Sequence, residues 1–232
     1  MSSISRTYVS GDSCTISATP STGYSFTGWY ENNTLSSNSN PWTFTVNANR
    51  NIQGRFSANA YVVSATVDPK DAGTVSGTGS YDYGTTATLT ATPATGYNFV
   101  NWTVGGSVVG SNPTYSFTVS GDATVQANFV IKTYNIAASV DPVGGGTVSG
   151  TGTYNHGQTV SLTATPSAGY AFVGWYTGAD SRISTDNPLT FTATESISYV
   201  AKFAPVYTIS VEYDNAKGTA AFVEAQSEEP AE

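Results

Sequence analysis

The chain has 232 residues, of which only 10% are charged, and its formal net charge is −8. Phosphate binding needs clustered Lys and Arg, so eight scattered basic residues argue against nucleic acid as a partner. A single cysteine excludes intrachain disulfides and cysteine-based metal clusters, and no apolar run approaches the roughly 18 residues of a membrane helix.

One aromatic stretch occurs three times along the chain. It reads ATPSTGYSFTGWY from Ala18, ATPATGYNFVNWT from Ala91 and ATPSAGYAFVGWY from Ala164, so successive copies are 73 residues apart. Self-similarity at a fixed period is typical of tandem arrays. A catalytic site needs one copy of its residues, whereas a core that is rebuilt in every unit needs one copy per unit. The stretch therefore predicts a core anchor and not an active site.

Within a unit, apolar and polar residues alternate, which is the period of a half-buried β-strand. In residues 159–165, one face carries Val160, Leu162 and Ala164, and the other face carries hydroxyl groups. The last strand of each unit repeats the alternation, at residues 52–56, 125–129 and 199–203. Glycines and Asn-Pro pairs mark turns, no segment has helical spacing, and the GTVSGTG stretches from Gly73 and Gly146 are predicted to form hairpins.

The period predicts an all-β, or nearly all-β, tandem array of small antiparallel β domains. Each domain has about 73 residues, and short linkers are expected to join them into an elongated rod. In chain order the predicted parts are three units at 1–57, 61–130 and 134–204, an orphan first-strand segment at 207–223 and an acidic tail at 224–232. The first unit lacks the equivalent of residues 61–73, which is its first strand.

The third unit combines Tyr134-Asn-Ile, Gly-Gly-Thr-Val-Ser-Gly, a Thr-Ala-Thr-Pro turn, Gly-Tyr-Ala-Phe-Val-Gly-Trp175 and Ala-Lys-Phe203. In this order and spacing, the motifs resemble the divergent internalin-type B-repeat, also called the Listeria–Bacteroides repeat, a module of bacterial surface proteins. The resemblance extends from Tyr8 to about Phe222. It implies tandem stalk or adhesion modules on a microbial surface, without enzymatic activity and without a cofactor.

Three functions remain open at this point. The first is a structural or adhesive stalk or display module on an extracellular microbial surface, with neighbouring copies or other surface proteins as partners. The second is a virion component, such as a phage fibre or a capsid decoration protein. Residues 1–14 contain no apolar signal segment, so either Met1 was added to an excised fragment or the protein does not use the general secretory route. The third is a carbohydrate-binding module with glycan partners.

Trp42 is the candidate for a sugar-binding or partner-binding residue, because it breaks the repeat. Its stretch NPWTFTV corresponds to NPTYSFTV and NPLTFTA in the other units. Trp42 is therefore either an exposed platform or a side chain that fills a local gap. His156, the only histidine, is predicted to be an exposed turn residue, and Cys14 to be a small buried hydrophobe. No residue is predicted to be catalytic or to bind a metal.

The two ends of the array are complementary. Tyr207, Ile209 and Val211 alternate as a first strand does, and an unpaired strand is a docking element. One hypothesis is that this strand completes the first unit of another copy and links chains head to tail. The alternatives are that excision set the boundaries or that the strand caps the third unit.

Overall fold

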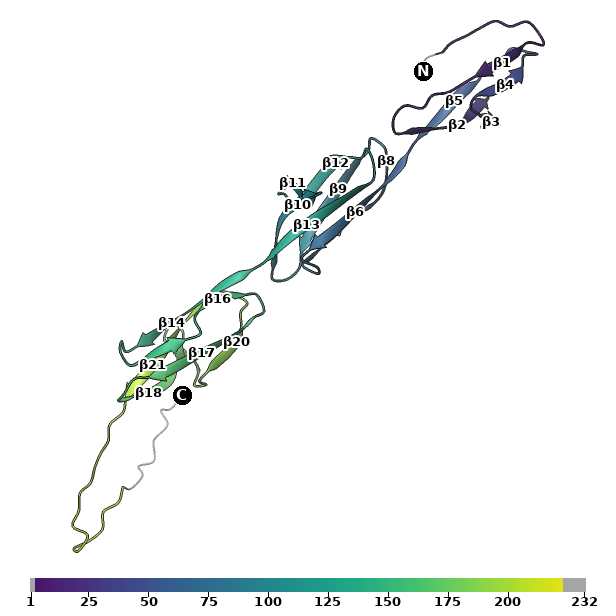
Figure 1. Ribbon diagram of the computed structural model, residues 1–232. Coiled ribbons are helices and arrows are strands. Elements are labelled where there is room, and N and C mark those ends of the chain that lie inside the picture. The colour runs from purple at the N-terminus through teal and green to yellow at the C-terminus, as the bar shows by residue number, and fades with distance from the viewer. Residues whose placement is uncertain (1–2, 223–232) are drawn as a thin grey trace. The chain divides into compact units, whose positions relative to one another are not determined.

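The computed structural model describes residues 3–222 (Figure 1). These residues form strands, turns and loops without a helix, so the all-β prediction is confirmed. The part of the chain that is described therefore has no helix long and apolar enough to span a membrane. The chain divides into two compact units, of which the first extends to Lys132 and the second begins at Thr133. The first two repeats belong to the first unit, and the third repeat belongs to the second.

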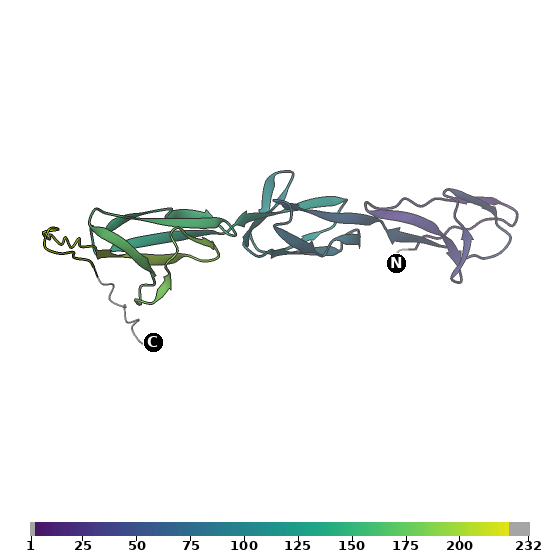
Figure 2. The same cartoon turned by 90° about the horizontal axis from the view of Figure 1, so that it is seen from below.

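The second repeat has eight strands. They are β6 (Ala60–Asp68), β7 (Gly73–Ser76), β8 (Gly79–Asp82), β9 (Thr86–Pro93), β10 (Tyr97–Val104), β11 (Ser107–Gly110), β12 (Thr114–Thr118) and β13 (Ala123–Ile131). They form a five-stranded sheet, β11-β10-β13-β6-β8, and a three-stranded sheet, β12-β9-β7 (Figure 2). Val63 and Val125 of the larger sheet and Ala87 and Leu89 of the smaller sheet share one buried core. The repeat is therefore a small sandwich.

The third repeat has the same architecture. Its strands are β14 (Thr133–Asp141), β15 (Gly146–Ser149), β16 (Gly152–Asn155), β17 (Thr159–Pro166), β18 (Tyr170–Tyr176), β19 (Arg182–Ser184), β20 (Leu189–Thr192) and β21 (Ile197–Pro205). The sheets are β16-β14-β21-β18-β19 and β15-β17-β20. Ile136, Leu162 and Trp175 lie in its core.

The first repeat has fewer strands. They are β1 (Ser13–Ile16), β2 (Tyr24–Glu31), β3 (Thr34–Ser37), β4 (Trp42–Thr45) and β5 (Gln53–Ala58). They form a two-stranded sheet, β1-β4, and a three-stranded sheet, β3-β2-β5. Strands equivalent to β6, β7 and β8 do not occur in residues 3–12, which precede β1.

One pairing in each complete repeat differs from the antiparallel pattern that was predicted. The first and last strands run parallel, with β6 beside β13 and β14 beside β21. Val63 stands opposite Ala123, and Ile136 stands opposite Ile197. Alternation along a strand indicates which residues face the core but not the direction of its neighbour, so the sequence could not reveal this pairing.

The GTVSGTG stretches do not form hairpins, contrary to the prediction. β7 pairs with β9 in the small sheet, whereas β8 pairs with β6 in the large sheet. The chain crosses from one sheet to the other between β7 and β8, at Gly77, and Gly150 has the same place in the third repeat. Gly150 has a φ of +91°, and a Cβ atom there would overlap the carbonyl oxygen of Ser161. The glycine is needed both for its conformation and for the close approach of two backbones.

The repeated aromatic stretch is the core anchor that the sequence predicts. The indole N–H of Trp102 donates a hydrogen bond to the carbonyl oxygen of Asn112 over 3.0 Å, and so ties β10 to the Asn-Pro turn. Trp29 and Trp175 donate to Ser39 and Asp186 in the same way. In each repeat the tryptophan also contacts a phenylalanine, with ring centroids 5.0, 5.5 and 5.5 Å apart. These hydrogen bonds satisfy an indole N–H at a buried position.

Replacement of Gly150 by alanine is expected to destabilise the third repeat by about 2 kcal/mol, because of backbone strain and the clash with Ser161. Gly178→Ala is the matched control, since a Cβ atom there meets nothing within 4 Å. Hydrogen exchange of the third-repeat amides measures the difference. Equal exchange in the two variants would contradict the close approach.

Candidate functional site

The first repeat is open at the place where the other two repeats are closed. In the second repeat, β6 pairs with one edge of β13 while β10 pairs with the other edge. β5 takes the place of β13 in the first repeat and is the edge strand of the sheet β3-β2-β5. An edge strand presents backbone donors and acceptors to a further strand. The structure thus identifies a candidate docking edge.

The segments that surround this open edge are shorter than their counterparts. β5 has six residues, whereas β13 and β21 have nine each. β1 has four residues, whereas β9 and β17 have eight each. Residues 6–9 correspond to β8 but form no strand. All three differences occur where a strand equivalent to β6 or β7 would provide the pairing partner.

The open edge also exposes part of the core. Phe56 is 45% exposed, whereas its counterparts Phe129 and Phe203 are 6% and 5% exposed. In the second repeat Gly73 of β7 lies directly on the Phe129 ring, since a Cβ atom on Gly73 would be 2.6 Å from Phe129 Cζ. The first repeat has a pocket of about 360 Å³ beside Phe56 instead. Its lining residues are Thr19, Ser21, Tyr24 and Phe56.

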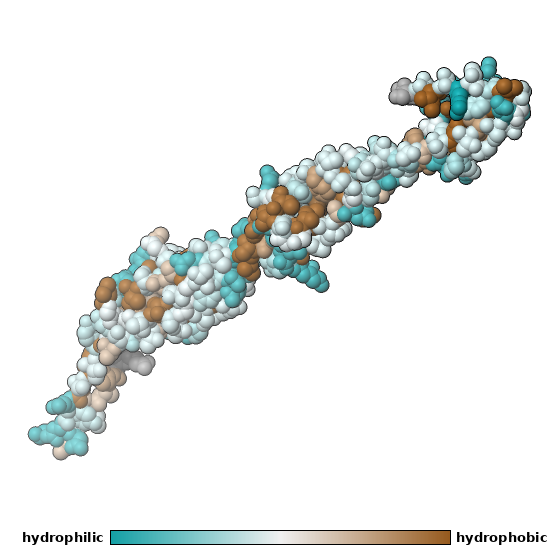
Figure 3. Space-filling model, turned by 45° about the horizontal axis from the view of Figure 1, so that its top comes forward, coloured by the Kyte–Doolittle hydropathy of each residue, from teal (hydrophilic) through white to brown (hydrophobic). Residues whose placement is uncertain are grey.

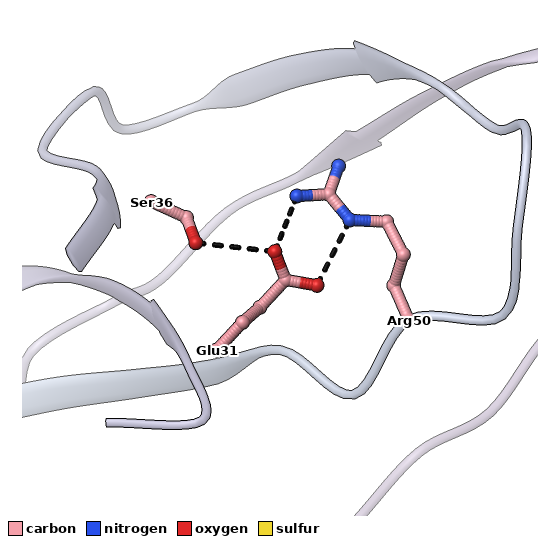
Figure 4. A network of polar contacts seen from close by, with 3 residues as sticks. All are labelled: Glu31, Ser36 and Arg50. Atoms are coloured by element: carbon pink, nitrogen blue, oxygen red, sulfur yellow. Dashed lines mark hydrogen bonds and ion pairs between the residues drawn. The ribbon is translucent and has the colours of Figure 1, made fainter. Parts of the chain in front are cut away.

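An ion pair lies at one end of this open region (Figure 4). Arg50 donates from Nε to Glu31 Oε1 over 2.9 Å and from Nη2 to Glu31 Oε2 over 2.5 Å. Ser36 Oγ also donates to Glu31 Oε2, over 3.1 Å. The hydrogen bond from Arg50 is the main reason why the pKa of Glu31 is lowered from its usual value. The contact is bidentate, which fixes the orientation of the guanidinium plane.

The guanidinium group of Arg50 covers two aromatic rings. Its carbon atom lies 4.9 Å from the ring centroid of Trp42 and 4.3 Å from that of Phe44. The positions equivalent to Arg50 are Ala123 and Ile197 in the complete repeats. The first repeat therefore covers this end of its core with a charged side chain that stacks on aromatic faces. Arg50 was not predicted to be a site residue, although a charge at an otherwise apolar repeat position was a usable signal.

Trp42 lies in β4 and is half-buried. Its ring packs against Phe44 with centroids 4.6 Å apart, and one of its faces lies beneath Arg50. This geometry favours the gap-filling interpretation, since a sugar platform needs a free aromatic face. A role for Trp42 in binding a partner stays a prediction.

The other singled-out side chains occupy packed positions. Cys14 is 7% exposed, as predicted for a small buried hydrophobe. His156 is half-buried and not exposed, so that prediction was wrong. Its ring lies 6.0 Å from the Tyr134 ring, much as Tyr83 lies 6.4 Å from Tyr61. The turn position thus packs against the tyrosine that begins the first strand. Residues 3–222 contain no group of three or more His, Cys, Asp or Glu side chains suited to a metal.

The segment from Tyr207 to Phe222 continues from β21, as β6 continues from β5 (Figure 1). Tyr207, Ile209 and Val211 are 84%, 73% and 50% exposed, and the segment forms no strand. The preceding N–H, that of Val206, donates to the carbonyl oxygen of Gly169 over 2.8 Å. Asn59 and Lys132 make the same hydrogen bond to Gly23 and Gly96. The segment therefore leaves the third repeat as a first strand does. Residues 223–232, including the predicted acidic tail, lie outside the described residues.

Three stretches of the chain, residues 2–60, 63–133 and 136–207, match the divergent InlB B-repeat domain. The chain belongs to the divergent InlB B-repeat family. The match confirms the resemblance that was inferred from the motifs, and it makes the protein a tandem repeat protein of a structural type. Among solved structures, the Bacillus anthracis TIE protein is similar over 71% of this chain and 38% of that chain, with 10% identity and a TM-score of 0.35. The search of curated proteins returned no significant match.

The stability of the first repeat is expected to fall in acid through Glu31. Arg50 lowers the pKa of this carboxyl below 4.5, so the stabilisation is fully present above about pH 4.5 and is lost as the pH falls through the lower, folded-state pKa. Glu31→Gln should therefore flatten the acid side of the stability profile of the first repeat. Glu195→Gln, in the third repeat, is the control. Hydrogen exchange of the β2 and β5 amides between pH 3 and pH 6, corrected for intrinsic rates, measures the effect. An unchanged profile in Glu31→Gln would contradict it.

Proposed function

We propose that the protein is a spacer and display module of an extracellular microbial surface. The observation that carries the proposal is that the repeated residues serve packing. Trp29, Trp102 and Trp175 are buried and satisfy their own hydrogen bonds within each repeat. A chain in which core residues recur, and reactive side chains do not, is suited to setting a distance and presenting surfaces. Membership of the InlB B-repeat family supports the surface location.

An adhesive role is supported by apolar side chains on the outer hairpin of each repeat. Leu35 in β3 is 50% exposed, Val108 in β11 is 64% exposed and Ile183 in β19 is 40% exposed. Val104 and Val109 extend the exposed apolar surface of the second repeat, and Figure 3 shows apolar side chains gathered at a few places on an otherwise polar surface. Several weak contacts of this kind add through multivalency, so a repeat array gains avidity without a deep pocket.

Antibodies against the chain are expected to label intact cells of the organism that makes it, because a display module must be accessible from outside. Permeabilised cells provide the control for total protein, and a known cytoplasmic protein provides the control for leakage. Labelling that requires permeabilisation would contradict the proposal. Detection of the chain in purified virus particles, without labelling of cells, would favour the virion interpretation instead.

A further inference from the structure

We propose that residues 207–219 of one copy, called the donor, insert into the first repeat of a second copy, called the acceptor. The inserted segment supplies the strand that pairs with β5. This inference goes beyond the proposed function, because a spacer needs no contact between copies. The proposed occupant of the open edge is a second copy of this chain. The register of the complete repeats and the side chains that match across it support this pairing.

The complete repeats determine which residues would face each other. Val63 stands opposite Ala123, and Ile136 stands opposite Ile197. The repeat spacing of 73 residues relates Ile209 to Ile136 and Arg50 to Ala123, and so it places Ile209 of the donor opposite Arg50 of the acceptor. Val63 and Ile136 are each 1% exposed, whereas Ile209 is 73% exposed in this chain. Insertion would therefore move Ile209 from water into the position of a core residue, which is a favourable transfer of apolar surface.

Side-chain sizes compensate across the proposed pairing. In the complete repeats Ala127 faces Val67 and Ala201 faces Val140, so a small residue meets a medium one. The first repeat has Gly54 at this position, and the donor segment has Tyr213. The smallest residue on the acceptor thus coincides with a large residue on the donor. Core packing tolerates substitutions that conserve total volume better than those that change it.

Charges also match at the outward-facing end of the pairing. In the third repeat Lys202 stands opposite Asp141, and Lys202 Nζ lies 3.7 Å from Asp141 Oδ2. The same register places Arg55 of the first repeat opposite Asp214 of the donor. Arg55 now donates to Asn33 Oδ1 and stacks over Tyr30. An opposite charge directly across two strands stabilises the correct register over a shifted one.

The second edge of the donor strand has a partner as well. Tyr61 pairs with Tyr81 between β6 and β8, and Tyr134 pairs with Tyr154 between β14 and β16. The equivalent pair is Tyr207 of the donor with Tyr8 of the acceptor. Insertion would therefore extend the sheet through residues 6–9, which form no strand in this chain.

The segment after the donor strand fits the pocket beside Phe56. Gly73-Thr74 begins β7 and covers Phe129. The donor has the same pair at Gly218-Thr219, one residue earlier than the repeat spacing of 73 residues gives, because residues 215–217 replace the four residues 69–72. With this shorter turn, Gly218 would lie on the Phe56 ring and fill the pocket that Thr19 and Tyr24 also line. The donor and acceptor surfaces are different parts of the chain. Such a heterologous contact generates rings or open chains and not closed two-fold dimers.

Light scattering over a concentration series tests the inference with two matched variants. Ile209→Ala removes apolar surface that insertion would bury, so it should weaken self-association at least about thirtyfold, because truncating a buried isoleucine loses its transfer free energy and leaves a cavity. Thr208→Ala is the control, since its counterpart Val62 is 58% exposed in the paired repeat. The wild type and Thr208→Ala should associate alike. A wild-type chain that stays monomeric at every concentration, or equal association of all three proteins, would overturn the inference.

Cysteine cross-linking tests the register independently. In a Cys14→Ala background, Arg55→Cys on one chain and Asp214→Cys on another should form a disulfide after mixing, because directly opposed residues lie within disulfide distance. Glu212→Cys replaces Asp214→Cys in the control, which shifts the thiol by two residues. Cross-linking of the matched pair in preference to the shifted pair supports the register. Equal cross-linking of both pairs, or of neither, would overturn it.

Discussion

The parallel contact between the first and last strand closes each repeat. This strand pair joins the beginning of the repeat to its end, and it places a full row of apolar side chains over the core. In the second repeat Val63 and Val125 are each 1% exposed because β6 and β13 lie side by side. Where that pairing is missing, in the first repeat, the neighbouring strands are shorter and Phe56 is exposed. One pairing therefore determines whether the sandwich is closed.

The aromatic cluster explains why the pairing matters so much. Phe26 and Phe56 are in contact with centroids 5.7 Å apart, and the equivalent pairs in the other repeats are 5.6 and 5.8 Å apart. The geometry of the cluster is thus the same in open and closed repeats. The difference is that β7 or β15 covers the cluster in the closed repeats, whereas a pocket lies beside Phe56 in the open repeat. A small domain has few other apolar contacts with which to offset such exposure.

The sequence predicted those parts of the fold that depend on local pattern. Alternation located the strand that contains Val160 and Leu162, and the 73-residue period identified Trp29, Trp102 and Trp175 as core anchors. It did not predict that β6 lies parallel to β13, or that β7 and β8 belong to different sheets. These features depend on which strands meet, and residues about 60 positions apart in the chain determine that. Pattern within a strand carries no information about such partners.

The candidate site likewise contains residues that the sequence predicted and residues that it did not. Tyr207, Ile209 and Val211 were recognisable as an unaccompanied strand because their alternation survives outside any complete repeat. Arg50 and Glu31 were not recognised, since 19 positions separate them and only the fold brings the carboxylate and the guanidinium together. The half-buried state of His156 was likewise inaccessible, because it depends on packing against Tyr134 of another strand.

Native-state hydrogen exchange of the dilute chain tests the central claim most directly, by comparing the amides of β5, β13 and β21 within one molecule. The three strands have equivalent places and equivalent phenylalanines, so their local stabilities differ mainly through the strand beside them. The account predicts that β5 exchanges far faster than β13 and β21, which share similar protection. Equal protection of all three strands would show that a repeat does not need the closing strand, and would contradict the account.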